Sequence, residues 1–515
     1  MSTNIFSSYK PLIFLLPKSD GDKGSGGNSN ITEKNADAKF SNNICFAHFN
    51  LGFNHFIHKS KEEKMEKVEK DFNGRKKIYL VVLPFEKNLD KTLNDTDISI
   101  GTAISSFIKS NVKTNVSNVL SRAYLKLWEM IIYFDLIEDT EQFTSAHIAE
   151  GPGSFVQATI MYRELQEKLK KIKSCKKDKY YVVTMYSDNE HLQIQKDFIN
   201  NYSKESTKRL HILETISTAS LNKYEQEGGG GVGGVGGVGA VGGVGAVGGV
   251  GGVGAVGGVG GVGGVGGVGG GVGAVGGGVG GDGDITKLNT IKLFGGSGKT
   301  KGFAENADLV TADGGFDWKN ETLQEQEAYK LIFGQIVTAL KVQKNNGHFV
   351  LKVFEMYTPV TLKLVEILNS VYKEVYICKP FTSRSSNSEK YVVCKGFIKK
   401  NITSKFMTQL ESLVDKLEKN VNFNIVDLFT NYTIPENIYN NYRLINNELM
   451  KVQYNAINNI HAFTNLETKN GKEYYEYLDN QISSSKYWID IFLNPDKYNN
   501  VHKYIKDVID KTYKQ

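Results

Sequence analysis

Two charged side chains of this sequence stand where burial makes charge costly. Lys352 lies inside the apolar run HFVLKVF, and Asp313 opens a Asp-Gly-Gly turn after the β-branched segment DLVTA. Burying an ammonium in a sheet that is covered on both faces is costly unless the ammonium is paired. The side chain of Lys352 therefore either reaches solvent at the end of its strand or is held in the sheet for a function. Asp313 is either a ligand-binding group at a strand end or the cap of an ordinary turn. Lysine and aspartate are among the side chains that can transfer protons in catalysis.

Two further segments are typical of ligand-binding turns. Glu150, Gly151, Pro152, Gly153 and Ser154 follow an apolar strand and open a helix. Glycine at such a turn lets the backbone approach a ligand, and the helix N-terminus offers N–H groups to an anion. The alternative is a tight turn without a ligand, because Val156 stands where a full dinucleotide fingerprint has glycine. The segment KPFTSRSSNSEKYVVCKGF leads through Glu389 into an apolar strand, and Glu389 can also be a solvated residue at the strand entrance.

Short β-branched runs alternate with longer amphipathic segments through the middle of the chain, a pattern typical of a doubly wound, mostly parallel α/β sheet. A helix is predicted over 115–137, and an exposed helix over 61–77. The predicted strands are Ala146–Glu150, Tyr180–Met185, Asp308–Ala312, His348–Val353, Glu374–Cys378 and Tyr391–Lys395. The remaining predicted helices are 154–172, 190–201, 320–343 and 358–371.

Composition divides the chain into four parts. Of its 54 glycines, 34 lie in the Gly/Val tract 228–281, which we interpret as an excursion from a surface loop. Residues 1–43 are predicted to be a disordered tail, 44–114 an N-terminal extension, and 115–400 the main domain interrupted by the tract. Residues 401–515 are predicted to be a helical C-terminal region without strands.

Net charge, cysteine spacing and hydrophobicity limit the classes of function that the chain can have. A net charge of +6 permits a nucleic-acid partner without requiring one. The four cysteines have no framework spacing, and no apolar segment has the composition of a membrane helix, so we expect a soluble, intracellular protein. Gly295–Thr300 resembles a phosphate loop but lacks its first glycine. Cys45, His48, His55 and His58 have a zinc-like spacing, although a packed strand is favoured there, and no metal is expected.

In combination, the motifs resemble those of the FtsJ-like RNA ribose 2′-O-methyltransferases. The resemblance runs in the family's order over residues 115–400 and is closest to the cap-specific branch found in eukaryotes and large DNA viruses. It implies a Rossmann-like methyltransferase fold that uses S-adenosylmethionine. The motifs that carry it are SRAYLKL, EGPGSF, GDGDIT, TADGGF, FVLKVF and SRSSNSEKYVVCKGF.

The resemblance also implies roles for individual residues. The family's catalytic tetrad falls on Lys126, Asp313, Lys352 and Glu389, with Lys352 as the base that takes the proton of the ribose 2′-hydroxyl. Burial and a second lysine would favour the neutral form of such a base, although coupled groups share their protons. Residues 150–154, Asp284 and Asp313 are the implied cofactor-binding residues. Asp188 is a ribose-binding candidate or a helix cap, and Arg384 is a candidate for substrate contact or a loop-stabilising residue.

The function implied is methylation of the first transcribed nucleotide of capped mRNA, with capped mRNA and capping-machinery proteins as the expected partners. The alternatives are a ribosomal-RNA 2′-O-methyltransferase and a catalytically inactive RNA- or cap-binding subunit with the same fold. The Asn/Lys/Ile/Tyr-rich composition points weakly to a giant virus or a protist. We therefore expect the protein in a host cytoplasm or virion if it is viral, and in a nucleus if it is cellular.

Overall fold

The fold is that of a computed structural model of the chain. It describes residues 11–18, 30–49, 51–52, 55–56, 59, 100–111, 119–189, 192–194, 196–203, 208–215, 281–298, 300–315, 320, 323–464 and 472–513. The helix predicted over 61–77 and nearly all of the Gly/Val tract lie outside these residues.

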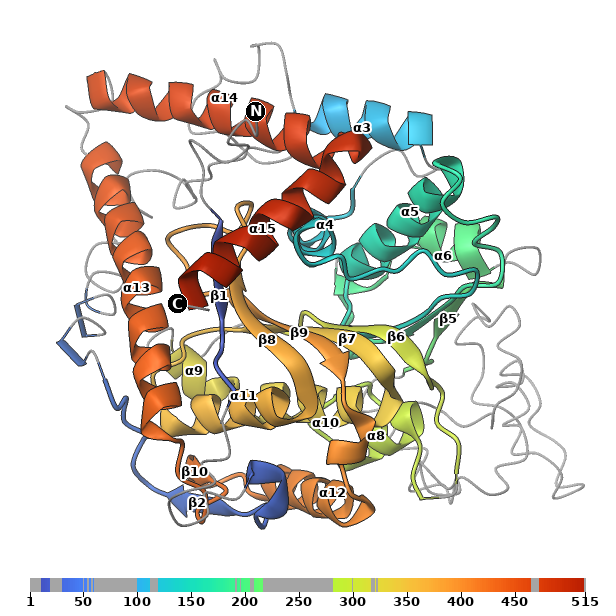
Figure 1. Ribbon diagram of the computed structural model, residues 1–515. Helices are drawn as coiled ribbons and strands as arrows, with labels where there is room; N and C mark the ends of the chain where they lie inside the picture. Colours follow the sequence, from blue (N-terminus) through green and yellow to red (C-terminus); the bar gives the residue numbers. More distant parts are fainter. Residues whose placement is uncertain are drawn as a thin grey trace, which may run out of the picture.

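A central eight-stranded sheet organises the described residues, with the strand order β1-β8-β9-β7-β6-β3-β4-β5 (Figure 1). Strands β5, β4, β3, β6 and β7 pair in parallel, whereas β9 is antiparallel to both β7 and β8, and β1 is antiparallel to β8. The predicted mostly parallel α/β sheet is therefore confirmed. The strands of this sheet are β1 (Leu12–Leu15), β3 (Thr144–Ile148), β4 (Lys179–Val183), β5 (Leu210–Ile212), β6 (Ala307–Ala312), β7 (Gln343–Val353), β8 (Tyr372–Lys379) and β9 (Lys390–Phe397).

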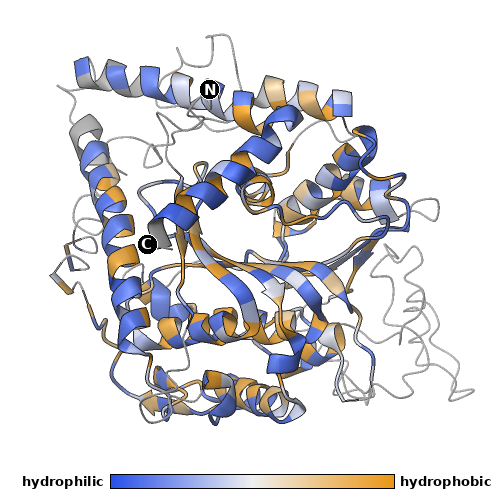
Figure 2. Ribbon diagram, in the orientation of Figure 1, coloured by the Kyte–Doolittle hydropathy of each residue, from blue (hydrophilic) through white to orange (hydrophobic). Residues whose placement is uncertain are grey.

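Helices cover both faces of the sheet, as the near-continuous apolar strands require. The helices associated with one apolar core are α3 (Ile100–Asn111), α4 (Ala123–Phe134), α5 (Ser154–Lys168), α6 (Lys196–Ser203), α14 (Lys472–Phe492) and α15 (Tyr498–Tyr513). Those associated with the other core are α8 (Leu288–Gly295), α10 (Tyr329–Val342), α11 (Pro359–Val371), α12 (Ser404–Lys419) and α13 (Glu436–Thr464). The short helix α9 (Gln324–Glu327) directly precedes α10. Figure 2 shows the hydrophobic residues of the sheet and of these helices gathered between the layers.

The six predicted strands are present, with boundaries shifted by a few residues. The strand predicted to end at Glu150 ends at Ile148, which leaves Glu150 in the following turn. The helix predicted over 320–343 is divided into α9 and α10, and α6 begins at Lys196 rather than at residue 190. In the region predicted as the helix 115–137, α4 spans Ala123–Phe134, and residues 112–118 lie outside the described part.

The predicted helical C-terminal region is confirmed by α12 to α15, but both terminal regions also contain strands that were not predicted. The expected disordered tail 1–43 contains β1, which extends the central sheet along β8, and β2 (Ala38–Ser41). Strand β2 pairs with β10 (Asn424–Leu428), so the C-terminal region is not purely helical. The predictions missed both contacts because a four-residue strand gives little periodicity, and its pairing partner lies hundreds of residues away.

The two ends of the undescribed segment 216–280 lie side by side. A Cβ built on Gly283 would lie 2.7 Å from Cγ2 of Thr215, the last described residue before the segment. Backbone N–H of Tyr186 also donates to the carbonyl of Asp282 at 2.8 Å. The chain thus leaves and re-enters the fold at one place, which is compatible with an excursion from a surface loop.

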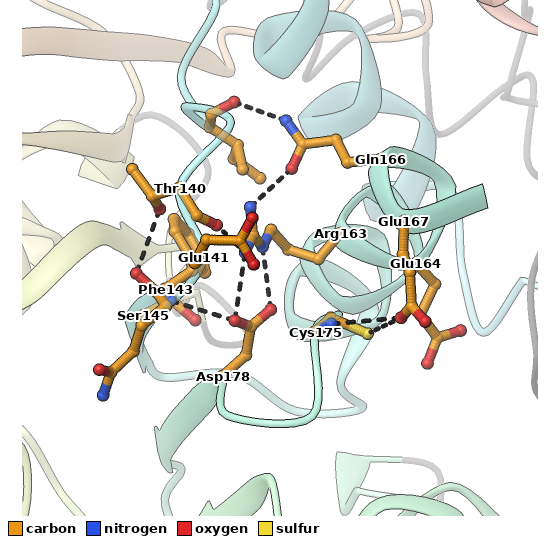
Figure 3. Close-up of polar contacts among 12 residues, drawn as sticks. Thr140, Glu141, Phe143, Ser145, Arg163, Glu164, Gln166, Glu167, Cys175 and Asp178 are labelled. Carbon is orange, nitrogen blue, oxygen red and sulfur yellow. Dashed lines mark hydrogen bonds and ion pairs between the residues drawn. The ribbon is translucent and has the colours of Figure 1, made fainter. Parts of the chain in front are cut away.

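A fully buried arginine links α5 to the sheet (Figure 3). Arg163 donates from Nε and Nη2 to the two carboxylate oxygens of Asp178 at 2.9 and 3.2 Å. Its other donors reach the carbonyls of Glu138 and Thr140 and the side chain of Gln166. Satisfying nearly every donor is what makes the burial of this charge tolerable.

We predict that Asp178→Asn destabilises the fold strongly, because it leaves the Arg163 charge buried without its counter-ion. The expected loss in the free energy of unfolding is about 3–5 kcal/mol. The matched control is Asp415→Asn, which removes the exposed pair with Lys419 and should cost under about 1 kcal/mol. Denaturant unfolding measures both values; equal losses would contradict this interpretation of the cluster.

Candidate active site

The predicted site residues gather at the carboxyl edge of the parallel strands. The register aligns the strand ends, because Ile148 lies opposite both Val183 and Ala312, and Ala312 lies opposite Leu351. The residues that follow these positions therefore form a row along the edge. This is the edge where open α/β sheets bind ligands.

Lys126 and Glu389 form one ion pair of the site. Nζ of Lys126, on α4, lies 2.6 Å from Oε1 of Glu389, and each side chain is 13% exposed. The hydroxyl of Ser383 donates to the same carboxylate oxygen at 2.9 Å. Glu389 ends the loop between β8 and β9, so this pair joins a helix and a loop from distant parts of the sequence.

Lys352 and Asp313 form the second pair. Nζ of Lys352 lies 3.3 Å from Oδ1 of Asp313 and donates to the carbonyl of Asp313 at 2.7 Å. A Cβ on Gly315 would lie 3.2 Å from this Nζ, so glycine leaves the ammonium its space. The hydroxyl of Tyr391 donates to Oδ1 of Asp313 at 3.0 Å. The structure thus brings the four tetrad candidates together as two partly buried ion pairs.

The two pairs are electrostatically linked. Burial alone would raise the pKa of Glu389, but the charges of Lys126 and Lys352 outweigh it and hold that pKa well below its usual range. Glu389 is therefore ionised at neutral pH. Two lysines and two carboxylates give the cluster a net charge of zero, which limits the cost of removing it from water.

Two residues that support the two ion pairs were not predicted from the sequence. The first is Tyr391, where burial raises the pKa well above its usual value and keeps the hydroxyl protonated as a donor to Asp313. The second is Lys379, whose Nζ donates to the carbonyls of Asn387 and Glu389 and closes the loop on itself. Burial lowers the pKa of Lys379. Both residues lie in the motif KPFTSRSSNSEKYVVCKGF, but their burial became apparent only from the fold.

Glu150 has a different local role from the one expected of its turn. Its Oε1 accepts the backbone N–H groups of Phe155 and Val156 at 2.6 and 3.0 Å, so the carboxyl caps α5 itself. Those two N–H groups are therefore not available to a ligand. Burial raises the pKa of Glu150 to about 8, with a further contribution from Asp313. Its second oxygen, Oε2, is buried and has no hydrogen-bond partner in the described part of the chain.

The turn of Gly151 and the segment GDGDIT meet beside Thr184, at the end of β4. A Cβ on Gly151 would lie 2.0 Å from the carbonyl oxygen of Leu192, and one on Gly283 would lie 2.1 Å from that of Thr184. Gly153, at φ +107°, turns the chain into α5. Glycine is required at these close approaches. The feature of this turn that a ligand could satisfy is the buried, unpartnered oxygen of Glu150.

The remaining candidates show local contacts at the same edge. Asp284 accepts from the backbone N–H and the hydroxyl of Thr286 at 2.9 and 2.8 Å. Asp188 is exposed and accepts from the hydroxyl of Tyr186 at 3.0 Å. The carbonyl of Arg384, in the loop before Glu389, accepts from the N–H of Asn387 at 3.3 Å. Their predicted roles toward cofactor and substrate stay predictions.

The zinc-like spacing of Cys45, His48, His55 and His58 and the possibility of a membrane helix can also be compared with the structure. Cys45 is buried and donates from Sγ to the carbonyl of Val426, and no group of potential metal ligands occurs among the described residues. His58, the last member of the zinc-like spacing, lies outside them. In the described part of the chain no helix has the length and hydrophobicity to cross a membrane.

Comparison with known proteins places this site in a family context. Residues 270–397 match the FtsJ-like methyltransferase family and include Asp313, Lys352 and Glu389. The chain is 36% identical over 189 residues to cap-specific mRNA (nucleoside-2′-O-)-methyltransferase 1 of Mus musculus, covering 35% of this chain and 22% of that protein. It is 30% identical over 178 residues to cap-specific mRNA (nucleoside-2′-O-)-methyltransferase 2 of Drosophila melanogaster, covering 34% and 25%.

The matches thus span about a quarter or less of these two curated relatives. Among solved structures, human methyltransferase-like protein 13 in complex with SAH covers 58% of this chain and 94% of its own, at 9% identity and a TM-score of 0.27. Residues 270–397 are therefore similar in sequence to the FtsJ-like methyltransferase family.

Proposed function

We propose that this protein is an S-adenosylmethionine-dependent RNA 2′-O-methyltransferase that acts on the first transcribed nucleotide of m7G-capped mRNA. The observation that carries the proposal is the pair of charge-balanced ion pairs, Lys126–Glu389 and Lys352–Asp313, at the carboxyl edge of the sheet. The similarity to cap-specific enzymes supports capped mRNA as the substrate.

The cofactor would be held by the turn 150–154 together with Asp284 and Asp313. Gly151 and Gly153 keep the backbone of this turn close to its neighbours, and the unpartnered Oε2 of Glu150 marks a polar position there. When bound, S-adenosylmethionine supplies a methyl group on a positively charged sulfur. The residues of the chain then have to orient one hydroxyl and remove its proton, because positioning contributes much of the rate of such a displacement.

Lys352 is the base in this proposal. In the ion pair Lys352 is an ammonium, so it first releases a proton to solvent. Its amine then accepts the 2′-hydroxyl proton at Nζ as the oxygen attacks, and Asp313 stabilises the ammonium formed. Lys126, fixed by Glu389, orients the hydroxyl oxygen. Arg384 lies in the loop that ends at Glu389 and is the candidate for contact with a substrate phosphate or the cap.

The proposed partners are capped mRNA and proteins of the capping machinery, and the proposed location is inside the cell. A positive net charge of +6 is compatible with RNA binding.

Lys352→Ala is expected to abolish most methyl transfer, since it removes the proton acceptor. A loss of about 10²- to 10⁴-fold in the single-turnover rate is expected. Lys344→Ala is the control, because Lys344 lies at the other end of β7 and pairs with Asp308 at 2.6 Å. Calorimetric binding of S-adenosylhomocysteine should be retained in both variants. Normal methyl transfer by Lys352→Ala would refute the catalytic assignment.

The choice of RNA is tested by comparing short transcripts with an m7G cap, with a 5′ triphosphate and with an internal target only. We expect tritium from labelled S-adenosylmethionine to enter the first nucleotide of the capped transcript alone. Equal labelling of uncapped or ribosomal RNA would favour the alternative of a ribosomal-RNA methyltransferase. Binding of RNA without any labelling would instead indicate an inactive binding subunit.

The Gly/Val tract is expected to be dispensable for this activity. Because Thr215 and Gly283 are neighbours, a short Gly/Ser linker can replace residues 228–280 without moving either end. The rate and the cofactor affinity of this deletion variant should stay within about threefold of wild type, since loop length changes closure entropy only slowly. Loss of cofactor binding would show that the tract contributes to the site.

A further inference from the structure

A buried carboxylate on α4, one turn beyond Lys126, has no place in the mechanism above. Glu129 is fully buried, and its two oxygens accept the backbone N–H groups of Phe381 and Thr382 at 2.7 and 2.9 Å. Burial raises the pKa of Glu129 to about 7. Burying a carboxyl is costly unless its oxygens accept hydrogen bonds. The hydrogen-bond donors to Glu129 lie near the start of the loop that leads to Glu389.

The third partner of this carboxyl comes from the C-terminal region. Nε1 of Trp488, on α14, donates to Oε1 of Glu129 at 3.1 Å. Next to it, the rings of Tyr487 and Phe381 pack edge to face with centroids 6.2 Å apart. Helix α14 therefore contacts the loop 380–389 directly and also through Glu129.

The contacts continue from this point to the active site. Thr382 is also fixed by Arg122, whose Nη2 donates to its carbonyl at 2.6 Å. The next residue, Ser383, donates from its hydroxyl to Glu389. Arg122, the N-cap of α4, and Lys126 and Glu129 within the helix are spaced four and three residues apart, so one face of the helix contacts both ends of the loop.

We propose that Glu129 and Trp488 are positioning residues that hold the Glu389 loop against α4, so that the C-terminal helix α14 sets the geometry of the ion pair between Lys126 and Glu389. The two residues act through the loop and do not contact substrate. This proposal rests on the proposed methyl transfer, whose rate is its readout. It also gives the C-terminal region a role in the site.

The test compares Glu129→Gln and Trp488→Phe with wild type. Glutamine presents an NH₂ group to one of the two backbone donors, and phenylalanine keeps a ring against Phe492 but removes the indole donor. We expect the rate of methyl transfer at saturating capped RNA to fall by about ten- to a hundredfold for Glu129→Gln. A smaller fall is expected for Trp488→Phe, and the affinity for S-adenosylhomocysteine should be unchanged in both.

Two matched controls separate positioning from general stability. Glu366→Gln alters another buried carboxylate, which accepts from the hydroxyls of Tyr442 and Tyr432 on the other side of the sheet. Tyr329→Phe removes a buried hydroxyl bond from α10 to the side chain of Thr358, which involves neither α14 nor the loop. Both should lower the melting temperature while keeping the rate near that of wild type.

The outcomes distinguish the two proposals. If wild type transfers no methyl group to any RNA tested, the proposed function fails. If wild type is active and Glu129→Gln and Trp488→Phe transfer methyl groups at the wild-type rate, the positioning role is wrong. It is also wrong if both control variants lose as much rate as Glu129→Gln and Trp488→Phe. Should Glu129→Gln fail to fold, Trp488→Phe still decides, because it keeps the aromatic packing.

Discussion

The organisation of the site depends on one constraint, the balance of four charges at the edge of a covered sheet. Lys126 and Lys352 are each little exposed, and each lies against a carboxylate. A buried ammonium without its counter-ion would destabilise the fold, so each carboxylate must be delivered to a fixed place. The strands, α4 and the β8–β9 loop are the elements that deliver them.

The four groups come from segments that are far apart in the sequence. Asp313 follows β6, and Lys352 lies near the end of the neighbouring parallel strand β7, so the register of the two strands places them together. Lys126 and Glu389 depend instead on contact between α4 and the loop that connects the antiparallel strands β8 and β9. The second pair therefore needs more support from its surroundings, and Lys379, Ser383 and Arg122 provide part of it.

Motif-bearing strands could be predicted from the sequence because a short apolar run followed by a polar turn is a local signal. The positions of Asp313, Lys352 and the Gly151 turn follow from that signal and from the rule that ligands bind at carboxyl ends of strands. Features that depend on distant contacts could not be predicted this way. Strands β1 and β2 in the supposed tail are one case, and the capping of α5 by Glu150 is another.

The roles of individual glycines also could not be predicted from the composition of the chain. Most glycines lie in the tract 228–281, and Thr215 and Gly283, which flank the segment that contains nearly all of it, are neighbours. The glycines with close contacts at the site are few. Gly151 and Gly283 are needed where backbones approach, and Gly315 where Lys352 passes. Composition alone could not separate these glycines from the others, because the distinction depends on which atoms lie next to them.

The central claim is that Lys352 takes the proton of a ribose 2′-hydroxyl held between the two ion pairs. A crystal structure of the protein with S-adenosylhomocysteine and a short capped RNA tests it most directly. We expect the 2′-oxygen of the first transcribed nucleotide to lie within about 3 Å of Nζ of Lys352. A ribose bound away from this edge, with Lys352 still paired only to Asp313, would contradict it.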